Sequence, residues 1–234
     1  MEIEVRELTK TFGPVTAVRN LSFTAPAGQV TGLIGPNGSG KTTTLRVALG
    51  LVRPSAGTVL IGGARYAELR RPRRTAGAML EATGFHPGQR ARDHLRVLAA
   101  AAGVPDRRVG EVLAEVGLAD AAGRRIRGFS LGMRQRLGLA GALLGDPPVL
   151  LLDEAANGLD PAGIAWLRGL LRGLAAQGRT VVIASHVLGE VAQTAGHVVI
   201  VSGGRLRFAG PLSELAADGG SLESAFLRLT GAPA

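Results

Sequence analysis

The segment from Gly35 to Thr42 constrains the fold of this chain more than any other feature. It reads Gly35-Pro36-Asn37-Gly38-Ser39-Gly40-Lys41-Thr42 and fits the pattern G-x-x-x-x-G-K-[ST]. The apolar run from Val30 to Ile34 precedes it, and a helical pattern from Lys41 to Leu49 follows and ends at Gly50. We therefore expect a strand, a loop and a helix in this order.

A loop of this kind is suited to phosphate groups. Its glycines let consecutive backbone N–H groups converge on phosphate oxygens, and the N-terminus of the following helix adds a favourable dipole. Lys41 is expected to reach the β- and γ-phosphates, and Thr42 to offer its hydroxyl to Mg²⁺. An ordinary glycine-rich turn is the alternative. Against it stand the flanking strand and helix, and the placement of one of only two lysines, Lys10 and Lys41, in the loop.

A second apolar run ends in two carboxylates. Val149 to Leu152 is followed by Asp153 and Glu154. At the carboxyl edge of a parallel sheet, Asp153 can hold Mg²⁺ through water, and Glu154 can orient or deprotonate an attacking water. Adjacent strand residues point to opposite faces, so the two acids would do different jobs. Alone, such a pair could equally cap a helix, but together with the phosphate loop it indicates nucleotide hydrolysis.

Strands and helices alternate along much of the chain, which predicts an α/β fold with a phosphate-loop NTPase core and a mostly parallel sheet. Two further stretches, Ile3 to Leu8 and Leu21 to Thr24, predict a small N-terminal antiparallel β layer, with a turn at Phe12-Gly13-Pro14. The other expected strands are Thr58 to Ile61, Thr180 to Ala184 and Val198 to Val201, with a hairpin from Val199 to Phe208.

Helical patterns dominate the middle of the chain. We expect residues 1–234 to form a single domain, with an α-helical subdomain at about 84–145 inserted in the core and short C-terminal helices at about 211–230. The charged segment from Arg65 to Arg74 is expected to be exposed. The expected helices are Ala91 to Ala102, Arg107 to Val116, Met133 to Leu144, Pro161 to Ala176, one after His186, Leu212 to Ala217 and Leu222 to Leu229.

Composition excludes several classes of protein. With 46% hydrophobic residues the chain can bury a core, and no cysteine is present to form a disulfide, a thiolate zinc site or a thiol nucleophile. No apolar run is long enough for a membrane-spanning helix, and the start lacks a signal-peptide pattern, so a cytoplasmic location is expected. The net charge of +9 suits nucleic acid or an anionic membrane, but nearly all basic residues are arginines and no basic block appears. This pattern is typical of codon bias as much as of selection for phosphate binding, and no nucleic-acid partner is expected.

Three further segments resemble the motifs of the ATP-binding cassette (ABC) family. Phe129-Ser130-Leu131-Gly132-Met133-Arg134-Gln135-Arg136 resembles the family's signature L-S-G-G-Q-R-Q-R. Asn157-Gly158-Leu159-Asp160 stands where the family has its D-loop, and Ala184-Ser185-His186 ends a later strand where its switch histidine stands. The order and spacing of these motifs cover nearly the whole chain.

The resemblance implies a head-to-tail dimer, expected to be a homodimer, in which two composite sites bind ATP. Ser130 is a good helix N-cap, and this helix end would cover the γ-phosphate of the ATP held by the other subunit. His186 would contact the γ-phosphate in its own subunit, and Phe12 would stack on adenine, unless it is a simple core residue. The resemblance also assigns Thr43, Gly132 and Asp160 to nucleotide binding. Surface or structural roles are expected for His86, His94 and His197.

The sequence departs from the family pattern in informative places. Glu81 stands where the family has a Gln that contacts Mg²⁺ and faces the membrane partner, so it is expected at the metal; the alternative is a side chain in solvent or against an arginine of that partner. Leu131 and Met133 replace a Gly and the Gln of the signature, and Ala155 replaces a Pro. Glu81, the residues that follow it and the tail from Ser221 to Thr230 resemble the bacitracin-resistance, lantibiotic-immunity and multidrug-export branch.

The resemblance implies an ATP-hydrolysing subunit that powers a separate integral-membrane permease, with export of a drug, a peptide antibiotic or a lipid-like molecule. Such a subunit would be cytoplasmic and peripheral on the inner face of the cell membrane. A soluble ABC-type ATPase acting on ribosomes or nucleic acid is the alternative, but the chain has one cassette and no room for a long coiled-coil insertion. A monomeric phosphate-loop kinase or GTPase leaves Ser130 and His186 unexplained.

Overall fold

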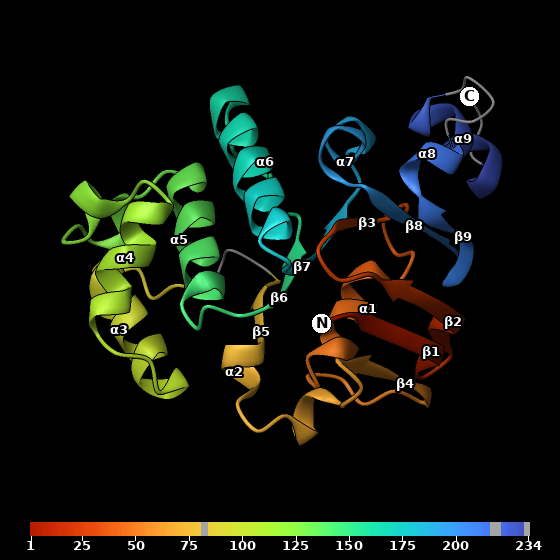
Figure 1. Ribbon diagram of the computed structural model, residues 1–234, viewed down its shortest axis with the longest axis horizontal. Coiled ribbons are helices and arrows are strands. Elements are labelled where there is room, and N and C mark those ends of the chain that lie inside the picture. The colour runs from red at the N-terminus through yellow and green to blue at the C-terminus, as the bar shows by residue number, and fades with distance from the viewer. Residues whose placement is uncertain (81–83, 216–220, 232–234) are drawn as a thin grey trace.

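The computed structural model describes residues 1–80, 84–215 and 221–231, which contain a six-stranded sheet and a three-stranded sheet (Figure 1). The larger sheet has the order β5-β6-β7-β3-β8-β9, and its neighbours are parallel except for the antiparallel pair β8 and β9. The predicted α/β fold with a mostly parallel sheet is confirmed. The strands are β3 (Val30–Ile34), β5 (Ala76–Met79), β6 (Val149–Asp153), β7 (Thr180–Ser185), β8 (His197–Ser202) and β9 (Arg205–Pro211).

The smaller sheet is the expected N-terminal antiparallel layer, with the order β2-β1-β4. Its strands β1 (Ile3–Phe12) and β2 (Val15–Ala25) are longer than the apolar patterns predict, because β1 continues to the turn at Gly13. The strand expected at Thr58 to Ile61 belongs to this sheet as β4 (Ala56–Ile61).

The central strands separate two hydrophobic cores. Every residue of β3, β6 and β7 is buried, as expected for strands covered on both faces. Alternate side chains of β6 enter different cores: Leu150 and Leu152 pack with the helices, whereas Leu151 packs with the antiparallel sheet. The apolar runs of the sequence thus correspond to strands that must fill space on both sides.

Helices α3, α4 and α5 gather on one side of the large sheet, on the left in Figure 1. The helix from Pro161 to Ala176 was predicted with its observed bounds, since Asp160 caps it and Pro161 opens it. The helix expected from Leu212 to Ala217 extends beyond the described residues. The helices are α1 (Lys41–Ala48), α2 (Pro72–Thr75), α3 (Ala91–Ala102), α4 (Arg107–Glu115), α5 (Leu131–Leu143), α6 (Pro161–Ala176), α7 (Leu188–Thr194), α8 (Leu212–Leu215) and α9 (Leu222–Thr230).

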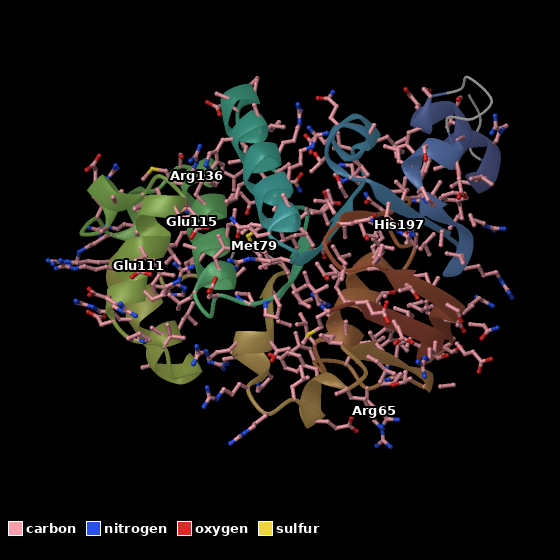
Figure 2. All side chains as sticks on the ribbon, viewed as in Figure 1. Arg65, Met79, Glu111, Glu115, Arg136 and His197 are labelled. Carbon is pink, nitrogen blue, oxygen red and sulfur yellow. The ribbon has the colours of Figure 1, made fainter. Side chains whose placement is uncertain are left out.

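Strand β5 is the strand of the large sheet that the sequence analysis missed. Its residues Ala76-Gly77-Ala78-Met79 are small or unbranched and are weak strand formers. Close packing against α5 requires them: a Cβ on Gly77 would lie 1.9 Å from the carbonyl oxygen of Ala142, and a Cβ on Gly138 would lie 2.7 Å from the sulfur of Met79. Figure 2 shows Met79 at this junction between the sheet and the helices. Among the described helices, none combines the length and apolarity needed to cross a membrane.

Candidate active site

The segment from Gly35 to Thr42 forms a loop between β3 and α1 in which glycine is required. A Cβ on Gly35 would lie 2.1 Å from the carbonyl oxygen of Val201, and Gly40 has a φ of +102°. Within the described residues, no side chain caps the start of α1. Its first N–H groups therefore face the loop without a side-chain acceptor, which suits an anion. The hydroxyl oxygen of Ser39 is also buried without a partner in the described part of the chain.

The ammonium group of Lys41 folds back over this loop. Its Nζ donates hydrogen bonds to the carbonyl oxygens of Gly35 at 2.7 Å and of Pro36 at 3.2 Å. Burial lowers the pKa of Lys41, while the nearby carboxylates of Glu154 and Asp153 act to raise that pKa. A phosphate oxygen could replace the two carbonyls as the partner of this cation, and it would carry more negative charge than they do.

Thr42 and Asp153 come together as a pair of oxygen donors. The Thr42 hydroxyl donates a hydrogen bond of 2.6 Å to Oδ2 of Asp153. The other carboxylate oxygen, Oδ1, is buried and has no partner among the described residues. Burial raises the pKa of Asp153, and the hydrogen bond from Thr42 opposes this rise. A hydroxyl and an unsatisfied carboxylate oxygen are ligands that Mg²⁺ prefers, so the pair fits that cation.

Glu154 and His186 meet from the ends of β6 and β7. Nδ1 of His186 lies 2.8 Å from Oε1 of Glu154. Glu154 has a φ of +51°, a conformation that residues other than glycine seldom adopt, and its backbone N–H donates to the carbonyl oxygen of Ala184 at 2.9 Å. A carboxylate paired with an imidazole can accept a proton and pass it on.

Ser130 caps α5 as expected, and its Oγ accepts a hydrogen bond of 3.2 Å from the N–H of Met133. The structure places Gly132 against Gly158 and Leu159, not against the phosphate loop of the same chain. Leu131, which replaces a glycine of the signature, is 57% exposed. The start of α5 thus faces outward beside the segment of residues 155–160.

Three other candidate residues have different surroundings. The carboxylate of Asp160 caps α6 by accepting a hydrogen bond of 2.7 Å from the N–H of Gly163. Phe12 is 48% exposed, so it is not a simple core residue, and the ammonium of Lys10 lies 4.6 Å from the centre of its ring. Thr43 is half-buried in the first turn of α1. Glu81 lies outside the described residues.

Sequence reasoning missed two contacts at the site. Lys10 covers one face of the Phe12 ring, and Gln135 on α5 donates a hydrogen bond of 3.0 Å to the carbonyl oxygen of Glu154. For Lys10 the signal was the scarcity of lysine, and for Gln135 it was its place inside the signature. The described residues hold no group of three or more acidic or histidine side chains that could bind a metal by themselves.

The remaining histidines lie apart from this site. His94 packs edge-to-face on Phe85 with ring centres 5.1 Å apart, and burial lowers the pKa of its imidazole. The His86 Nδ1 accepts a hydrogen bond of 3.2 Å from the N–H of Gly88. Burial also lowers the pKa of His197, which lies on β8 (Figure 2). Each of these contacts is local to its own part of the fold.

Together, the phosphate loop after β3, the acidic pair after β6 and the histidine after β7 define a phosphate-loop nucleoside triphosphatase. A family model described as ABC transporter matches residues 18–157. The chain belongs to the ABC transporter family, and like that family it binds and hydrolyses ATP.

Curated relatives and solved structures agree with this assignment. The lantibiotic transport ATP-binding protein SrtF of Streptococcus pyogenes is 35% identical over 87% of this chain and 88% of its own length. The bacitracin transport ATP-binding protein BcrA of Bacillus licheniformis is 40% identical over 87% of this chain and 68% of its own length. The solved structure of the ATP-binding subunit of an ABC transporter is 28% identical, with a TM-score of 0.88 over 98% of this chain and 99% of its own.

These findings decide between the alternatives that the sequence left open. The relatives are transport proteins, which favours an ATPase of transport over one that acts on ribosomes or nucleic acid. They also match the branch suggested by the sequence. The kinase or GTPase alternative is excluded with the family assignment.

Proposed function

We propose that this protein is the ATP-hydrolysing subunit of an exporter for a peptide antibiotic, a drug or a lipid-like molecule. It would act from the cytoplasm on the inner face of the cell membrane, bound to a separate integral-membrane permease. The observation that carries the proposal is the likeness, over 87% of the chain, to proteins named for lantibiotic and bacitracin transport.

The phosphate loop supplies the binding energy for ATP. Lys41 exchanges the carbonyls of Gly35 and Pro36 for β- and γ-phosphate oxygens, and the free N–H groups at the start of α1 bind the same phosphates. Phe12 stacks on adenine with the face that Lys10 does not cover. The residues assigned to ATP binding are Phe12, Gly35, Pro36, Asn37, Gly38, Ser39, Gly40, Lys41, Thr42, Thr43, Ser130, Gly132 and Asp160.

Thr42 and Asp153 would hold Mg²⁺, and Glu81 is a further candidate ligand. When bound, Mg²⁺ neutralises charge on the β- and γ-phosphates. Glu154 accepts the proton of the attacking water, and His186 holds the Glu154 carboxylate in place while it contacts the γ-phosphate. The hydrogen bond between these two side chains supports their joint role.

The outward-facing start of α5 supports a head-to-tail dimer of two copies of this chain. The start of α5 lies beside residues 158–159 of its own chain, which supports a phosphate supplied to Ser130 and the N–H groups behind it by a partner. A bacterial ABC transporter cassette of the same fold, 23% identical with a TM-score of 0.81 over 89% of this chain, is described as dimeric.

A hollow between the core and the helices supports a docking site for the permease. It has a volume of about 370 Å³ and lies between α1, α2 and β5 on one side and α3 and α5 on the other. Tyr66, Leu80, Gly84, Phe85 and Leu98 line it. We assign the helices on its far side, within residues 84–145, to the helical subdomain. Arg73, an exposed arginine of the segment 65–74, also lines the hollow.

Expression of this chain with its permease in a bacitracin-sensitive and lantibiotic-sensitive bacterium tests the proposal. The wild-type pair should raise the inhibitory concentration of at least one such peptide, and Glu154→Gln should abolish the protection. Glu111→Gln, an exposed carboxylate on α4, is the matched control and should protect like wild type. Protection by Glu154→Gln, or none by wild type against peptide antibiotics, drugs and lipid-like toxins, would contradict export powered by this site.

A further inference from the structure

One side chain joins the signature helix to the backbone of the proposed catalytic base. Gln135 lies on α5 and is only 6% exposed, and its Nε2 donates a hydrogen bond of 3.0 Å to the carbonyl oxygen of Glu154. A carbonyl oxygen only accepts hydrogen bonds, so the amide must present its NH₂ group there. The same helix carries Ser130 at its N-terminus, five residues before Gln135.

The backbone of Glu154 needs such support. Its φ of +51° is a strained conformation for a residue with a side chain, and such a conformation persists only where neighbours hold it. Three hydrogen bonds do so: the N–H of Glu154 donates to Ala184, and the carbonyl oxygen accepts from Gln135 and from the N–H of Asn157 at 3.1 Å. The other two bonds join backbone groups, whereas Gln135 donates from its side chain. It lies on α5, outside β6 and β7.

The start of α5 also rests directly on the segment that follows Glu154. A Cβ on Gly158 would lie 2.3 Å from the Leu131 side chain, and a Cβ on Gly132 would lie 3.2 Å from the carbonyl oxygen of Gly158. A side chain at Gly158 would collide with Leu131, and one at Gly132 would be a tight fit against the backbone of Gly158. A displacement of the N-terminal end of α5 is therefore passed to the backbone at residues 154–158.

Stability does not explain an amide at position 135. Its Oε1 is buried and has no partner among the described residues, and a half-satisfied buried amide is unfavourable. If the amide were lost, the carbonyl oxygen of Glu154 would keep its hydrogen bond from Asn157. An apolar side chain of similar length would thus leave the fold intact but would no longer restrain the Glu154 carbonyl, so the hydrogen bond from Gln135 serves to position Glu154.

We propose that Gln135 is a positioning residue that couples the two ATP sites of the dimer. The N-terminal end of α5 binds the nucleotide held by the partner, and Gln135 fixes the Glu154 carboxylate of its own site relative to that end. Each site then hydrolyses ATP efficiently only while the other is closed on nucleotide. The inference rests on the proposed head-to-tail dimer and on Glu154 as the base.

Two variants test this role in the full chain. Gln135→Met removes the donor at similar volume, and we expect kcat to fall about 10- to 100-fold, as a misplaced catalytic group does. ATP affinity of the monomer should stay within about twofold, the unfolding temperature should be unchanged, and the Hill coefficient for ATP should fall to about 1. Gln193→Met, on the exposed face of α7, is the control and should behave like wild type.

Gln135→Glu supplies a second readout, because a carboxyl donates a hydrogen bond only when it is protonated. Its kcat relative to wild type should rise as the pH is lowered, whereas the ratio for Gln135→Met should stay flat. A merely structural role predicts the reverse pattern: lower unfolding temperatures, parallel pH profiles and an unchanged Hill coefficient. Wild-type kcat in Gln135→Met, or failure of both variants to fold, would equally overturn the coupling role.

Failure of this inference can be separated from failure of the proposed function. Wild-type turnover in Glu154→Gln would overturn Glu154 as the base, whatever Gln135 does. In the Glu154→Gln background, Gln135→Met should still form an ATP-bound dimer by gel filtration. If that dimer forms while the Hill coefficient of Gln135→Met in the wild-type background is unchanged, only the coupling is wrong.

Discussion

The hydroxyl of Thr42 and the carboxylate of Asp153 are joined by a hydrogen bond of 2.6 Å across 111 positions of sequence. This contact ties the first turn of α1 to the end of β6 and leaves the second carboxylate oxygen of Asp153 buried without a partner in the described part of the chain. Without a ligand, the buried and unpaired carboxylate oxygen destabilises the protein, and a bound cation would satisfy it.

Asp153→Asn should therefore stabilise the nucleotide-free protein. Because burial raises the pKa of Asp153, the folded chain holds that proton more tightly than the unfolded chain does. The contribution of Asp153 to the free energy of unfolding is fully present below the usual carboxyl pKa. It is lost as the pH rises through the raised pKa. At pH 7 the variant should unfold about 2–4 °C higher without nucleotide, if the charge costs about 1 kcal/mol.

Thermal unfolding without ligand measures this stabilisation, and thermal unfolding with ATP and Mg²⁺ measures how much stability the ligands add. The variant should lose most of the extra stability that ATP with Mg²⁺ gives to wild type. Asp120→Asn, an exposed carboxylate, is the control and should change neither value. A lower unfolding temperature for Asp153→Asn without ligand would show that the Asp153 charge does not destabilise the nucleotide-free protein.

Lys41→Ala should abolish hydrolysis and greatly weaken ATP binding, because the triphosphate loses its lysine contact in the loop. Equilibrium titration with a fluorescent ATP analogue and steady-state turnover measure the two effects. Arg53→Ala, an exposed cation outside the phosphate loop, serves as the control for net charge. The assignment of the phosphate loop would not survive wild-type turnover in Lys41→Ala.

Glu154→Gln keeps the shape of the side chain and removes the base. Hydrolysis should slow about 10²- to 10⁴-fold, the usual contribution of a general base, while ATP binding is retained. The ATP-bound dimer should then accumulate, and gel filtration with ATP and Mg²⁺ detects it. A profile that stays monomeric, with or without the permease, would count against the head-to-tail dimer.

Ser130→Arg should stop turnover without weakening the ATP affinity of the monomer, because a bulky side chain at the start of α5 would meet the nucleotide of the partner. Turnover and monomer affinity are measured on the same preparation. Ser213→Arg, on the exposed side of α8, is the control. Surviving turnover in Ser130→Arg would mean that each site is complete within one chain.

Glu81→Gln should flatten the Mg²⁺ dependence of ATP affinity and leave an active ATPase. A carboxylate at the metal attracts Mg²⁺ but repels the γ-phosphate when the cation is absent, whereas an amide does neither strongly. Glu81→Ala should lower hydrolysis and its coupling to transport. ATP titrations of wild type and Glu81→Gln at several Mg²⁺ concentrations test this, and parallel curves would refute a metal contact.

The parts of the fold that the sequence predicted are those with a clear signal in consecutive residues. Helix α6 has its cap at Asp160 and its proline at Pro161, and the apolar runs of β3 and β7 are strands because both of their faces are buried. Strand β5 escaped prediction because its shape is imposed by the approach of α5 to Gly77, which no local pattern reveals.

The candidate site divides in the same way. The phosphate loop and the acidic pair are contiguous motifs, so the sequence alone predicts their residues. The contacts of Gln135 with Glu154 and of Lys10 with Phe12 depend on side-chain direction in the folded chain. The signature motif predicts which residues form the start of α5, but the direction of each side chain depends on the packing of the helix against the rest of the fold.

The strand order also governs when this protein can first bind ATP during its synthesis. The phosphate loop follows β3, yet the neighbours of β3 in the sheet are β7 and β8, which begin at Thr180 and His197. A ribosome-bound chain that has exposed only its first 150 residues holds the complete loop sequence but has no strand to pair with β3. Pairings this distant along the chain form late. We therefore expect a product truncated before β7 to carry the loop sequence without a formed ATP site.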